Sequence, residues 1–317
     1  MKLSSFLYES KKYIGVLQGD QMINLTLLND LYKKQHLVDS TIPANIEQFI
    51  ENQETLIPYA EKLLEYFEEN SIEIQGIVCS LSEVDILAPF TKPEKIICVG
   101  LNYLDHCKET GMEPPAAPVI FSKYANAIIG HEDEIECPVN SNQVDFEAEL
   151  VVIIGKEAKW ISEEEAEDYI FGYTIMNDVS ARDIQFADGQ WVRGKSPDTF
   201  APIGPVIVTK DQIKDPHQLD ISLTLNGEFM QQSNTKNLIH RIPTIISYLS
   251  QSMTLKPGDI IATGTPPGVG MGRDPKVWLN EGDELSITIE NIGTLTNFVK
   301  KTAASEKNSS KESLLSN

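Results

Sequence analysis

The chain has 317 residues, and its 47 acidic residues against 26 basic ones give a formal net charge of -21 at pH 7. This excess of negative charge argues against nucleic acid and anionic membranes as partners, because both repel an acidic surface. The longest apolar runs have the length of strands, so we expect no membrane span and no signal segment. Four cysteines without the paired spacing of a metal site predict a cytoplasmic protein with reduced thiols.

Residues 1–88 carry no motif that points to chemistry, and we expect a small α+β domain there, followed by a larger domain at 89–301. The opening residues 2–24 predict two short strands around the turn Gln18-Gly19-Asp20. Apolar residues from Ile46 to Phe67 then recur at helical spacing, with Pro58 as an interruption. The expected task of this domain is packing or support of a dimer.

A candidate acid–base pair follows the apolar strand at 96–99. His106 and Glu109 are three residues apart, so their side chains are neighbours if the segment is helical. Glu109 can then hold one imidazole nitrogen while the other acts as a base near neutral pH. The alternative is an ordinary surface pair. Residues 111–118, rich in Gly and Pro, predict an irregular lid over the site.

Three carboxylates stand at alternate positions where residues 145–149 run into an apolar strand. In a strand, Asp145, Glu147 and Glu149 leave the same face. Neighbouring charges about 7 Å apart repel by about 2 kcal/mol at an effective dielectric near 20, and burial adds to this cost. A divalent cation removes the penalty, and Asp178, at the end of a second predicted strand, can complete its cage. The alternative is a set of solvated charges on a strand edge.

Oxygen ligands without Cys or His select a hard cation, so we expect Mg2+ or Mn2+, with Ca2+ also suitable, and no organic cofactor. Coordination positions left open by three ligands can receive a substrate that offers two oxygens. A 2-oxo acid does so through its carboxylate and keto oxygens, and the metal then acts as a Lewis acid.

Candidate substrate-binding residues lie on the segment after Asp178. Arg182 and Gln185 share one helical face, where the guanidinium can hold a substrate carboxylate. The alternative partners of Arg182 are Asp183 and Asp188. Lys195, preceded by a glycine that allows close backbone approach, can stabilise an enolate; alternatively it is a solvated loop lysine.

The Gly- and Pro-rich run 262–270 lacks the Lys-Ser/Thr ending of a phosphate-binding loop, which rejects nucleotide binding. It follows a strand-like segment and can present the Thr265 hydroxyl and backbone amides to an anionic substrate. A plain structural turn is the alternative.

Four further patterns predict supporting elements. They are a capping box at Ser162 and Glu165 that starts a short helix, a hairpin at Asn226-Gly227, an apolar helical stripe from Ile242 to Leu249, and a closing strand in which Leu285, Ile287 and Ile289 alternate. The polar stretch from 302 to 317 is expected to be disordered.

The order of these segments strongly resembles the fumarylacetoacetate hydrolase family over residues from about 90 to 297. The resemblance is carried by GLNY with His106 and Glu109, DFEAELVVIIG, GYTIMNDVSARDIQ, RGKSPDTFAPIGP, TLNGEFMQ, SYLSQSMTLKPGDIIATGTPPGVG and EGDELSITIENIGTLTN. It implies a mixed α+β, predominantly β fold, with a β-sandwich roll as the catalytic domain and a small N-terminal domain. It also implies a homodimer.

The resemblance assigns roles residue by residue. It makes Glu147, Glu149 and Asp178 the metal ligands, and His106 with Glu109 a dyad that activates water or moves protons. It places Lys123, Arg182, Gln185, Lys195 and Thr265 around the substrate. Tyr124, next to Lys123, and Pro197 depart from the family pattern, which leaves the choice of substrate open because both residues can reshape the pocket.

The resulting hypothesis is a metal-dependent enzyme that acts on a small-molecule 2-oxo acid or its enol through an enolate stabilised by the metal. Carbon–carbon hydrolysis, as in acylpyruvate and fumarylacetoacetate hydrolases, and decarboxylation of an oxaloacetate-like acid are favoured. Enol–keto isomerisation and the isomerase and decarboxylase of hydroxyheptadienedioate in aromatic catabolism use the same enolate. A noncatalytic protein that senses a metabolite or binds a partner protein is the alternative from a different class.

Overall fold

The N-terminal part of the computed structural model combines five strands with three helices. The structure describes residues 1–302, so the disorder predicted for the stretch from 302 to 317 falls almost entirely outside the described residues. The elements are β1 (Lys2–Tyr8), β2 (Lys11–Gln18), β3 (Gln21–Asn24), α1 (Leu25–Gln35), α2 (Ile46–Glu51), α3 (Gln53–Glu69), β4 (Val78–Ser80) and β5 (Asp85–Leu87).

Two details of this part differ from the prediction. Residues 2–24 form three strands, because the chain also turns at Glu9 and Ser10, which both have positive φ and give no Gly, Pro or Asn signal. Pro58 lies inside α3, and the helical run is interrupted at Asn52 instead. Pro58 is exposed, so water can satisfy the backbone carbonyl that loses its partner.

The larger part is dominated by strands. In chain order its strands are β6 (Ile96–Gly100), β7 (Val119–Lys123), β8 (Ile128–Ile129), β9 (Glu134–Cys137), β10 (Val144–Asp145), β11 (Ala148–Ile154), β12 (Ile170–Asn177), β13 (Ser180–Ala181), β14 (Ala201–Thr209), β15 (Asp220–Leu225), β16 (Glu228–Asn234), β17 (Ile260–Ala262), β18 (Glu284–Ile289) and β19 (Gly293–Lys301). Its helices are α4 (Leu104–Thr110), α5 (Arg182–Ala187), α6 (Val192–Lys195) and α7 (Ile242–Ser252).

Two sheets organise the molecule. A 12-stranded sheet has the order β4-β3-β2-β1-β14-β12-β11-β17-β6-β7, with β5 beside β1 and β8 beside β14. A 5-stranded sheet has the order β16-β15-β18-β19-β9. The antiparallel pair β1 and β14 joins the N-terminal strands to the larger part. The predicted mixed, predominantly β fold is confirmed, whereas the division at residue 88 stays a prediction.

Most of the turns and helices predicted for the larger part are present in the structure. The Asn226-Gly227 turn joins β15 to β16, and α7 buries Ile242, Ile245, Ile246 and Leu249 as expected. The Glu165 carboxylate accepts the Ser162 amide at 2.8 Å, and a short 3-10 helix follows at Ala166–Tyr169. Leu285, Ile287 and Ile289 are buried in β18, but β18 is not a closing strand: β19 follows it in the chain and lies between β18 and β9 in the sheet.

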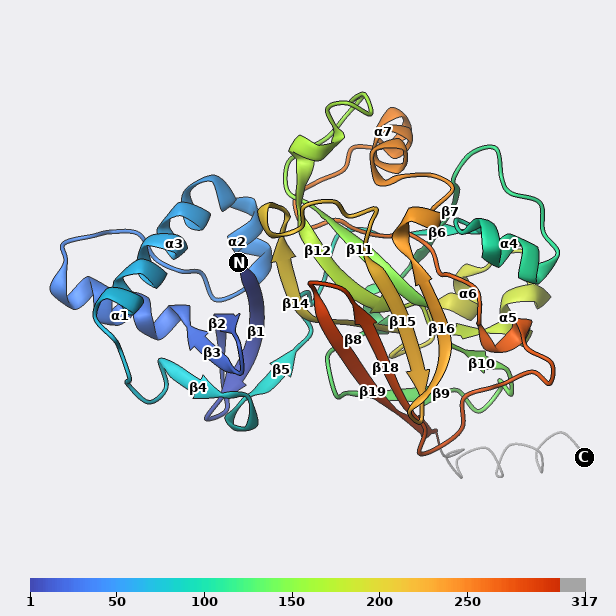
Figure 1. Cartoon of the computed structure of the whole chain (residues 1–317), viewed down its shortest axis with the longest axis horizontal. Coiled ribbons are helices and arrows are strands. Elements are labelled where there is room, and N and C mark those ends of the chain that lie inside the picture. The colour runs from blue at the N-terminus through green and yellow to red at the C-terminus, as the bar shows by residue number, and fades with distance from the viewer. Residues whose placement is uncertain (303–317) are drawn as a thin grey trace, which may run out of the picture.

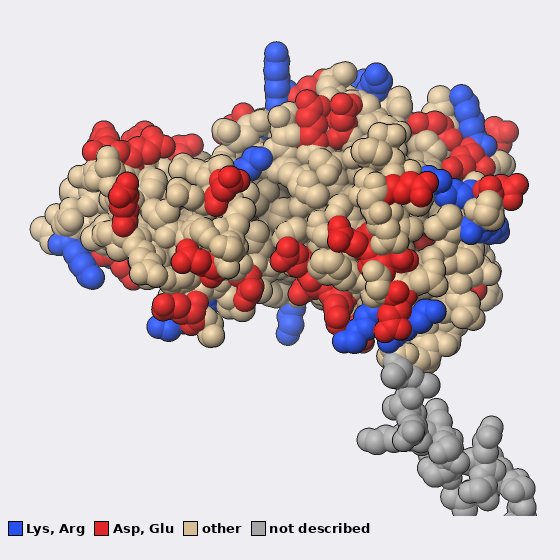
Figure 2. All heavy atoms as spheres, turned by 60° about the horizontal axis from the view of Figure 1, so that its bottom comes forward, with Lys and Arg blue, Asp and Glu red and all other residues tan. Residues whose placement is uncertain are grey.

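Helices α4, α5 and α6 gather at the end of the molecule opposite α1, α2 and α3 (Figure 1). The surface between these ends is acidic: Figure 2 shows Asp and Glu side chains spread across one face, with fewer Lys and Arg among them. No helix in residues 1–302 is long and apolar enough to cross a membrane.

His217 contacts the start of α7, and its protonation is expected to make the stability of the fold depend on pH. Its Nε2 accepts the Ile242 amide at 3.1 Å, which requires a neutral ring. Burial and then Arg241 lower the pKa of His217, although Asp215 acts in the opposite direction. As the pH falls below the ordinary His pKa of about 6.5, the unfolded chain binds the proton first and stability falls. We expect the loss between pH 7.5 and 5.5 to be smaller in His217→Gln, measured by urea unfolding.

An equal loss of stability in both proteins over this pH range would show that His217 is not the responsible group. The glutamine side chain still offers an oxygen to the Ile242 amide, so the comparison changes titration more than capping.

Candidate active site

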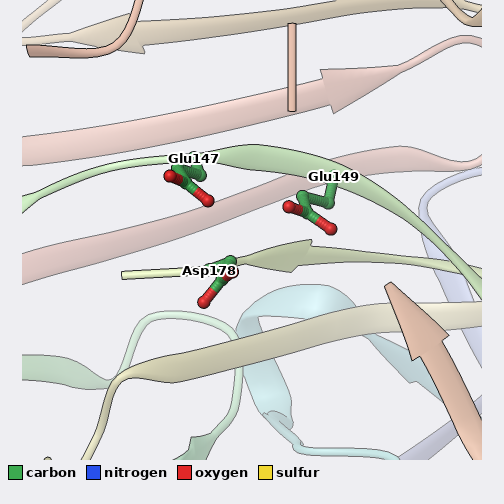
Figure 3. Close-up of side chains that lie close together, drawn as sticks. All are labelled: Glu147, Glu149 and Asp178. Atoms are coloured by element: carbon green, nitrogen blue, oxygen red, sulfur yellow. The ribbon is translucent and has the colours of Figure 1, made fainter. Parts of the chain in front are cut away.

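Three buried carboxylates lie together where β11 and β12 meet. Glu147 precedes β11, Glu149 belongs to it, and Asp178 follows the last residue of β12. The antiparallel register pairs Ala148 with Asn177, which brings Asp178 beside the two glutamates. One oxygen from each of the three carboxylates lies within 4.8 Å of the others (Figure 3).

Asp145 is the first correction to the predicted site. The stretch 145–149 is not one continuous strand, because β10 ends at Asp145 and β11 begins at Ala148. The Asp145 carboxylate therefore has other partners. It accepts hydrogen bonds from Arg182 Nε at 2.9 Å and from the amides of Gly270 and Met271 at 2.7 and 3.1 Å. Asp145 supports the site from outside the carboxylate cluster.

Two buried lysines neutralise part of the cluster. Lys123 Nζ lies 2.6 Å from Asp178 Oδ1, and Lys195 Nζ lies 2.8 Å from Glu147 Oε2 and 2.7 Å from Asp178 Oδ2. Burial lowers the pKa of Lys195, but Asp178 and Glu147 more than offset this and leave the pKa raised. The pKa of Lys123 is lowered, because burial and the nearby Lys195 outweigh Asp178. The solvated-loop alternative for Lys195 is wrong.

Nearby cations neutralise the negative charge of Glu147 but not that of Glu149. Burial raises the pKa of Glu147, but Lys195 and Arg182 reverse this effect and leave it lowered. Glu149 accepts the Gly264 amide at 2.8 Å, and among residues 1–302 it forms no ion pair with Lys or Arg. Burial, then Asp178 and Glu147, raise its pKa well above the ordinary value. A cation between the three carboxylates would supply the missing positive charge.

The donor set fits a hard divalent cation. All three side chains offer oxygen, which suits Mg2+, Mn2+ or Ca2+. Cys98 lies nearby, but burial, followed by Asp178 and Glu149, raises the pKa of its thiol well above the ordinary value. Within residues 1–302, the side chains placed to hold a metal are the three carboxylates and do not include this thiol.

His106 and Glu109 form the predicted contact on α4. His106 Nδ1 lies 3.2 Å from Glu109 Oε2, and Glu109 Oε1 accepts the Gly268 amide at 2.8 Å. Only 7% of the His106 surface is exposed, so the surface-pair alternative is wrong. The geometry provides a hydrogen-bonded imidazole next to the carboxylate cluster, as acid–base chemistry requires.

One pocket brings most of the predicted residues together. It is lined by Val99, Gly100, Leu101, His106, Met112, Phe121, Glu147, Glu149, Arg182, Gln185, Phe186, Trp191, Lys195, Thr265 and Met271. Glu109 contacts His106 of this set, Asp178 contacts Lys195 of this set, and Lys123 contacts Asp178. Sequence reasoning missed the apolar walls, such as Phe121 and Trp191, because no chemical motif marks them. Met112 does lie in the segment predicted as a lid.

Arg182 has different partners from those expected. Its Nε donates to Asp145 and its Nη1 donates to Gln185 Oε1 at 3.0 Å. Its Nη2 forms an ion pair with Glu147 Oε1 at 2.6 Å. The expected alternatives are wrong: Asp188 pairs with Arg193, and Asp183 accepts the Ser141 hydroxyl and the Asn142 amide. Arg182 also lines the pocket, so its guanidinium lies where a ligand would bind.

Several backbone amides of the loop after β17 donate hydrogen bonds to side chains of the protein itself. Those of Gly264, Gly268, Gly270 and Met271 donate to Glu149, Glu109 and Asp145 rather than to a ligand. Thr265 lines the pocket, and its hydroxyl accepts Gln231 Nε2 at 2.8 Å. The loop thus organises the site and contributes one side chain to it.

The two departures from the family pattern lie away from the pocket. Tyr124 is 58% exposed and borders a neighbouring groove, and Pro197 does not line the pocket. The expectation that both reshape the pocket is therefore not supported by their positions.

Comparison with known proteins gives the family. Residues 95–300 match the family described as "Fumarylacetoacetate (FAA) hydrolase C-terminal". The chain belongs to the fumarylacetoacetate hydrolase family. It is an enzyme of that family, and this displaces the noncatalytic alternative.

Three relatives within the fumarylacetoacetate hydrolase family are informative. "Oxaloacetate tautomerase Fahd2a, mitochondrial" from Rattus norvegicus is 46% identical over 262 residues, 82% of this chain and 81% of that protein. "Oxaloacetate tautomerase YisK" from Bacillus subtilis (strain 168) is 41% identical over 305 residues, 94% of this chain and 100% of that protein. A solved maleylpyruvate hydrolase from Sphingobium sp. SYK-6, in complex with manganese(II) ion and pyruvate, is 31% identical with a TM-score of 0.76, covering 96% of this chain and 100% of that one.

Proposed function

We propose that this enzyme interconverts the keto and enol forms of oxaloacetate and that it depends on a divalent metal. The observation that carries the proposal is the buried cluster of Glu147, Glu149 and Asp178 beside the pocket that His106 lines. Relatives that are 46% and 41% identical are named as oxaloacetate tautomerases, which favours this 2-oxo acid among those that fit the cluster.

Glu147, Glu149 and Asp178 would hold the cation, and the charged side chains around them would hold the substrate. When bound, a divalent cation holds the carboxylate and keto oxygens of a 2-oxo acid and draws electrons from the keto group. The Arg182 guanidinium would donate to a carboxylate oxygen of the substrate, and Gln185 and Thr265 would fix the orientation of that carboxylate. Because the outer surface is acidic (Figure 2), attraction for a dianion has to come from these buried groups.

His106 would move the proton. It would take a proton from C3 of the keto form and deliver a proton to the keto oxygen, so that the C3–H bond breaks, an O–H bond forms, and the double bond moves from C2=O to C2=C3. Glu109, bound to Nδ1, would hold the ring and stabilise its charged form. Lys195, whose pKa is raised mainly by Asp178 once the opposing effect of burial is overcome, would place a positive charge beside the developing enolate.

Carbon–carbon hydrolysis is the second candidate, and the maleylpyruvate hydrolase relative favours it. In that reaction, His106 and Glu109 would activate a water molecule instead of moving a substrate proton. Decarboxylation would use the same electron flow, with carbon dioxide leaving in place of the proton. The product therefore distinguishes the three reactions.

Three finer predictions belong to the proposal. The cation is Mg2+ or Mn2+, supported by the manganese(II) ion in the Sphingobium relative, with Ca2+ as a third choice. The enzyme is a homodimer, as the family resemblance implies. It is cytoplasmic, in line with four buried cysteines, all within residues 1–302, that form no disulfide there.

The first test is turnover by protein stripped of metal with a chelator. We expect ketonisation of enol-oxaloacetate, followed by its ultraviolet absorbance, to fall to the uncatalysed rate without metal and to return with Mg2+ or Mn2+. Pyruvate and carbon dioxide are measured in parallel, together with cleavage of acylpyruvates and maleylpyruvate.

Metal-dependent pyruvate formation or acylpyruvate cleavage that exceeds tautomerisation would replace the proposed reaction by decarboxylation or hydrolysis. Activity that survives complete removal of metal would contradict the role of the carboxylate cluster.

A further inference from the structure

One glycine-rich loop connects three separate carboxylates of the site. Between Gly264 and Gly272, four backbone amides donate hydrogen bonds to acidic side chains. Gly264 donates to Glu149 Oε2 at 2.8 Å, Gly268 donates to Glu109 Oε1 at 2.8 Å, and Gly270 and Met271 donate to Asp145 at 2.7 and 3.1 Å. The loop therefore contacts the carboxylate cluster, the His106 dyad and the partner of Arg182 at once.

The contact with Glu109 is built rigidly. Gly268 has φ +103°, and a Cβ there would lie 2.0 Å from the Met230 carbonyl oxygen, so only glycine fits. Arg273 donates from Nε to the Gly268 carbonyl at 3.2 Å and from Nη2 to the Met230 carbonyl at 2.6 Å. These bonds fix the direction of the Gly268 amide toward Glu109.

Gly272 closes the other side of the Glu109 carboxylate. A Cβ at Gly272 would lie 2.6 Å from Glu109 Cδ and 2.9 Å from its Cγ and Oε1. Gly272 is exposed, and its φ does not lie in the left-handed region, so an alanine fits the backbone itself. The three nearest atoms all belong to Glu109, and the simplest relief of the clash is movement of that flexible side chain.

We propose that Gly272 is a positioning residue that holds the Glu109 carboxylate in the place where it orients His106. The absence of a side chain at Gly272 lets the Glu109 carboxylate lie against the loop. There Oε1 accepts a hydrogen bond from the Gly268 amide, and Oε2 contacts His106 Nδ1. This inference rests on the proposed function for its kinetic consequence. Its structural consequence, displacement of Glu109, does not depend on the substrate.

Gly272→Ala is the informative substitution because the added methyl group reaches the dyad without entering the core. We expect kcat to fall about 10- to 100-fold, since the displaced carboxylate no longer orients the imidazole. The KM for oxaloacetate and the Kd for Mn2+ should stay within about twofold, because the cation and substrate contacts are left in place. The melting temperature should change little.

The same substitution in a Glu109→Ala background provides the matched control. Glu109→Ala removes the three atoms nearest to the Gly272 methyl group, so Gly272→Ala should then have no further effect on kcat. A loss of kcat that persists in this background would overturn the proposal, because it would show that Gly272 acts through another part of the loop. Unchanged kcat in the single variant would overturn it as well.

Nuclear magnetic resonance separates this inference from the proposed reaction. In protein labelled with 15N-histidine, the His106 signals are identified by their absence in His106→Gln. We expect the Nδ1 shift of His106 to move in Gly272→Ala, and to match that of Glu109→Ala more closely than that of the wild type. An unmoved signal would refute the positioning role even if the enzyme proves active on a different 2-oxo acid.

Discussion

Glu149→Gln is expected to abolish metal-dependent turnover and, in the same protein, to stabilise the metal-free fold. The amide oxygen can still accept the Gly264 amide, so the local geometry survives. Loss of the charge weakens binding of the cation, and we expect turnover to fall by a factor of about 10³ or more. Without metal, however, the buried Glu149 carboxylate destabilises the fold, because burial and its two acidic neighbours disfavour its charged form and raise its pKa.

The stability of the metal-free protein is measured as its melting temperature in the presence of a chelator. The affinity for the cation is measured as the Kd for Mn2+ by calorimetry. Glu147→Gln is the matched control. Glu147 is paired with Lys195 and Arg182, so its neutralisation removes one of the two carboxylate partners of each buried cation and should lower the melting temperature of the metal-free protein. Opposite stability effects for the two isosteric changes are expected. A lowered melting temperature in both would contradict the uneven charge compensation described above.

His106→Ala is expected to lower kcat for oxaloacetate tautomerisation by a factor of about 10² to 10⁴, the usual range for loss of a general base. His106 lines the pocket and pairs with Glu109, whereas Glu147, Glu149 and Asp178 are the residues that would hold the cation. The Kd for Mn2+ should therefore stay close to the wild-type value. Steady-state kinetics and calorimetry on the same preparation check both parts.

His36→Ala serves as the control for His106→Ala. His36 caps the end of α1 in the N-terminal part and stacks on Tyr32, far along the chain from the site, so its loss should leave kcat unchanged. Full activity of His106→Ala would show that another group moves the proton. Loss of Mn2+ binding together with activity would mean that His106 supports the metal site instead of the chemistry.

Local patterns predicted elements well where one stretch of chain decides the geometry. The Asn226-Gly227 turn and the apolar stripe of α7 appear where the sequence placed them, since turn conformations and helical periodicity depend on neighbouring residues. The turn at Glu9 and Ser10 was missed because neither residue type favours positive φ. Pro58 was misjudged because its effect depends on whether water reaches the carbonyl that it leaves without a donor.

The sequence alone determined which functional side chains could share a face. The spacing of Glu147 and Glu149 and that of His106 and Glu109 follow from backbone geometry, and the structure contains both pairs. Asp178 followed from its place at the end of a second predicted strand, and the resemblance added the family and the residue roles.

Only the tertiary structure decided the partners of the long charged side chains. Arg182 meets Asp145 and Glu147, Lys195 is buried between two carboxylates, and the amides of the 264–272 loop turn to three acidic residues far away in the chain. Such contacts join segments up to 159 residues apart, as between Glu109 and Gly268. The packing of sheets and loops sets these distances, whereas local spacing fixes only the face from which a side chain leaves.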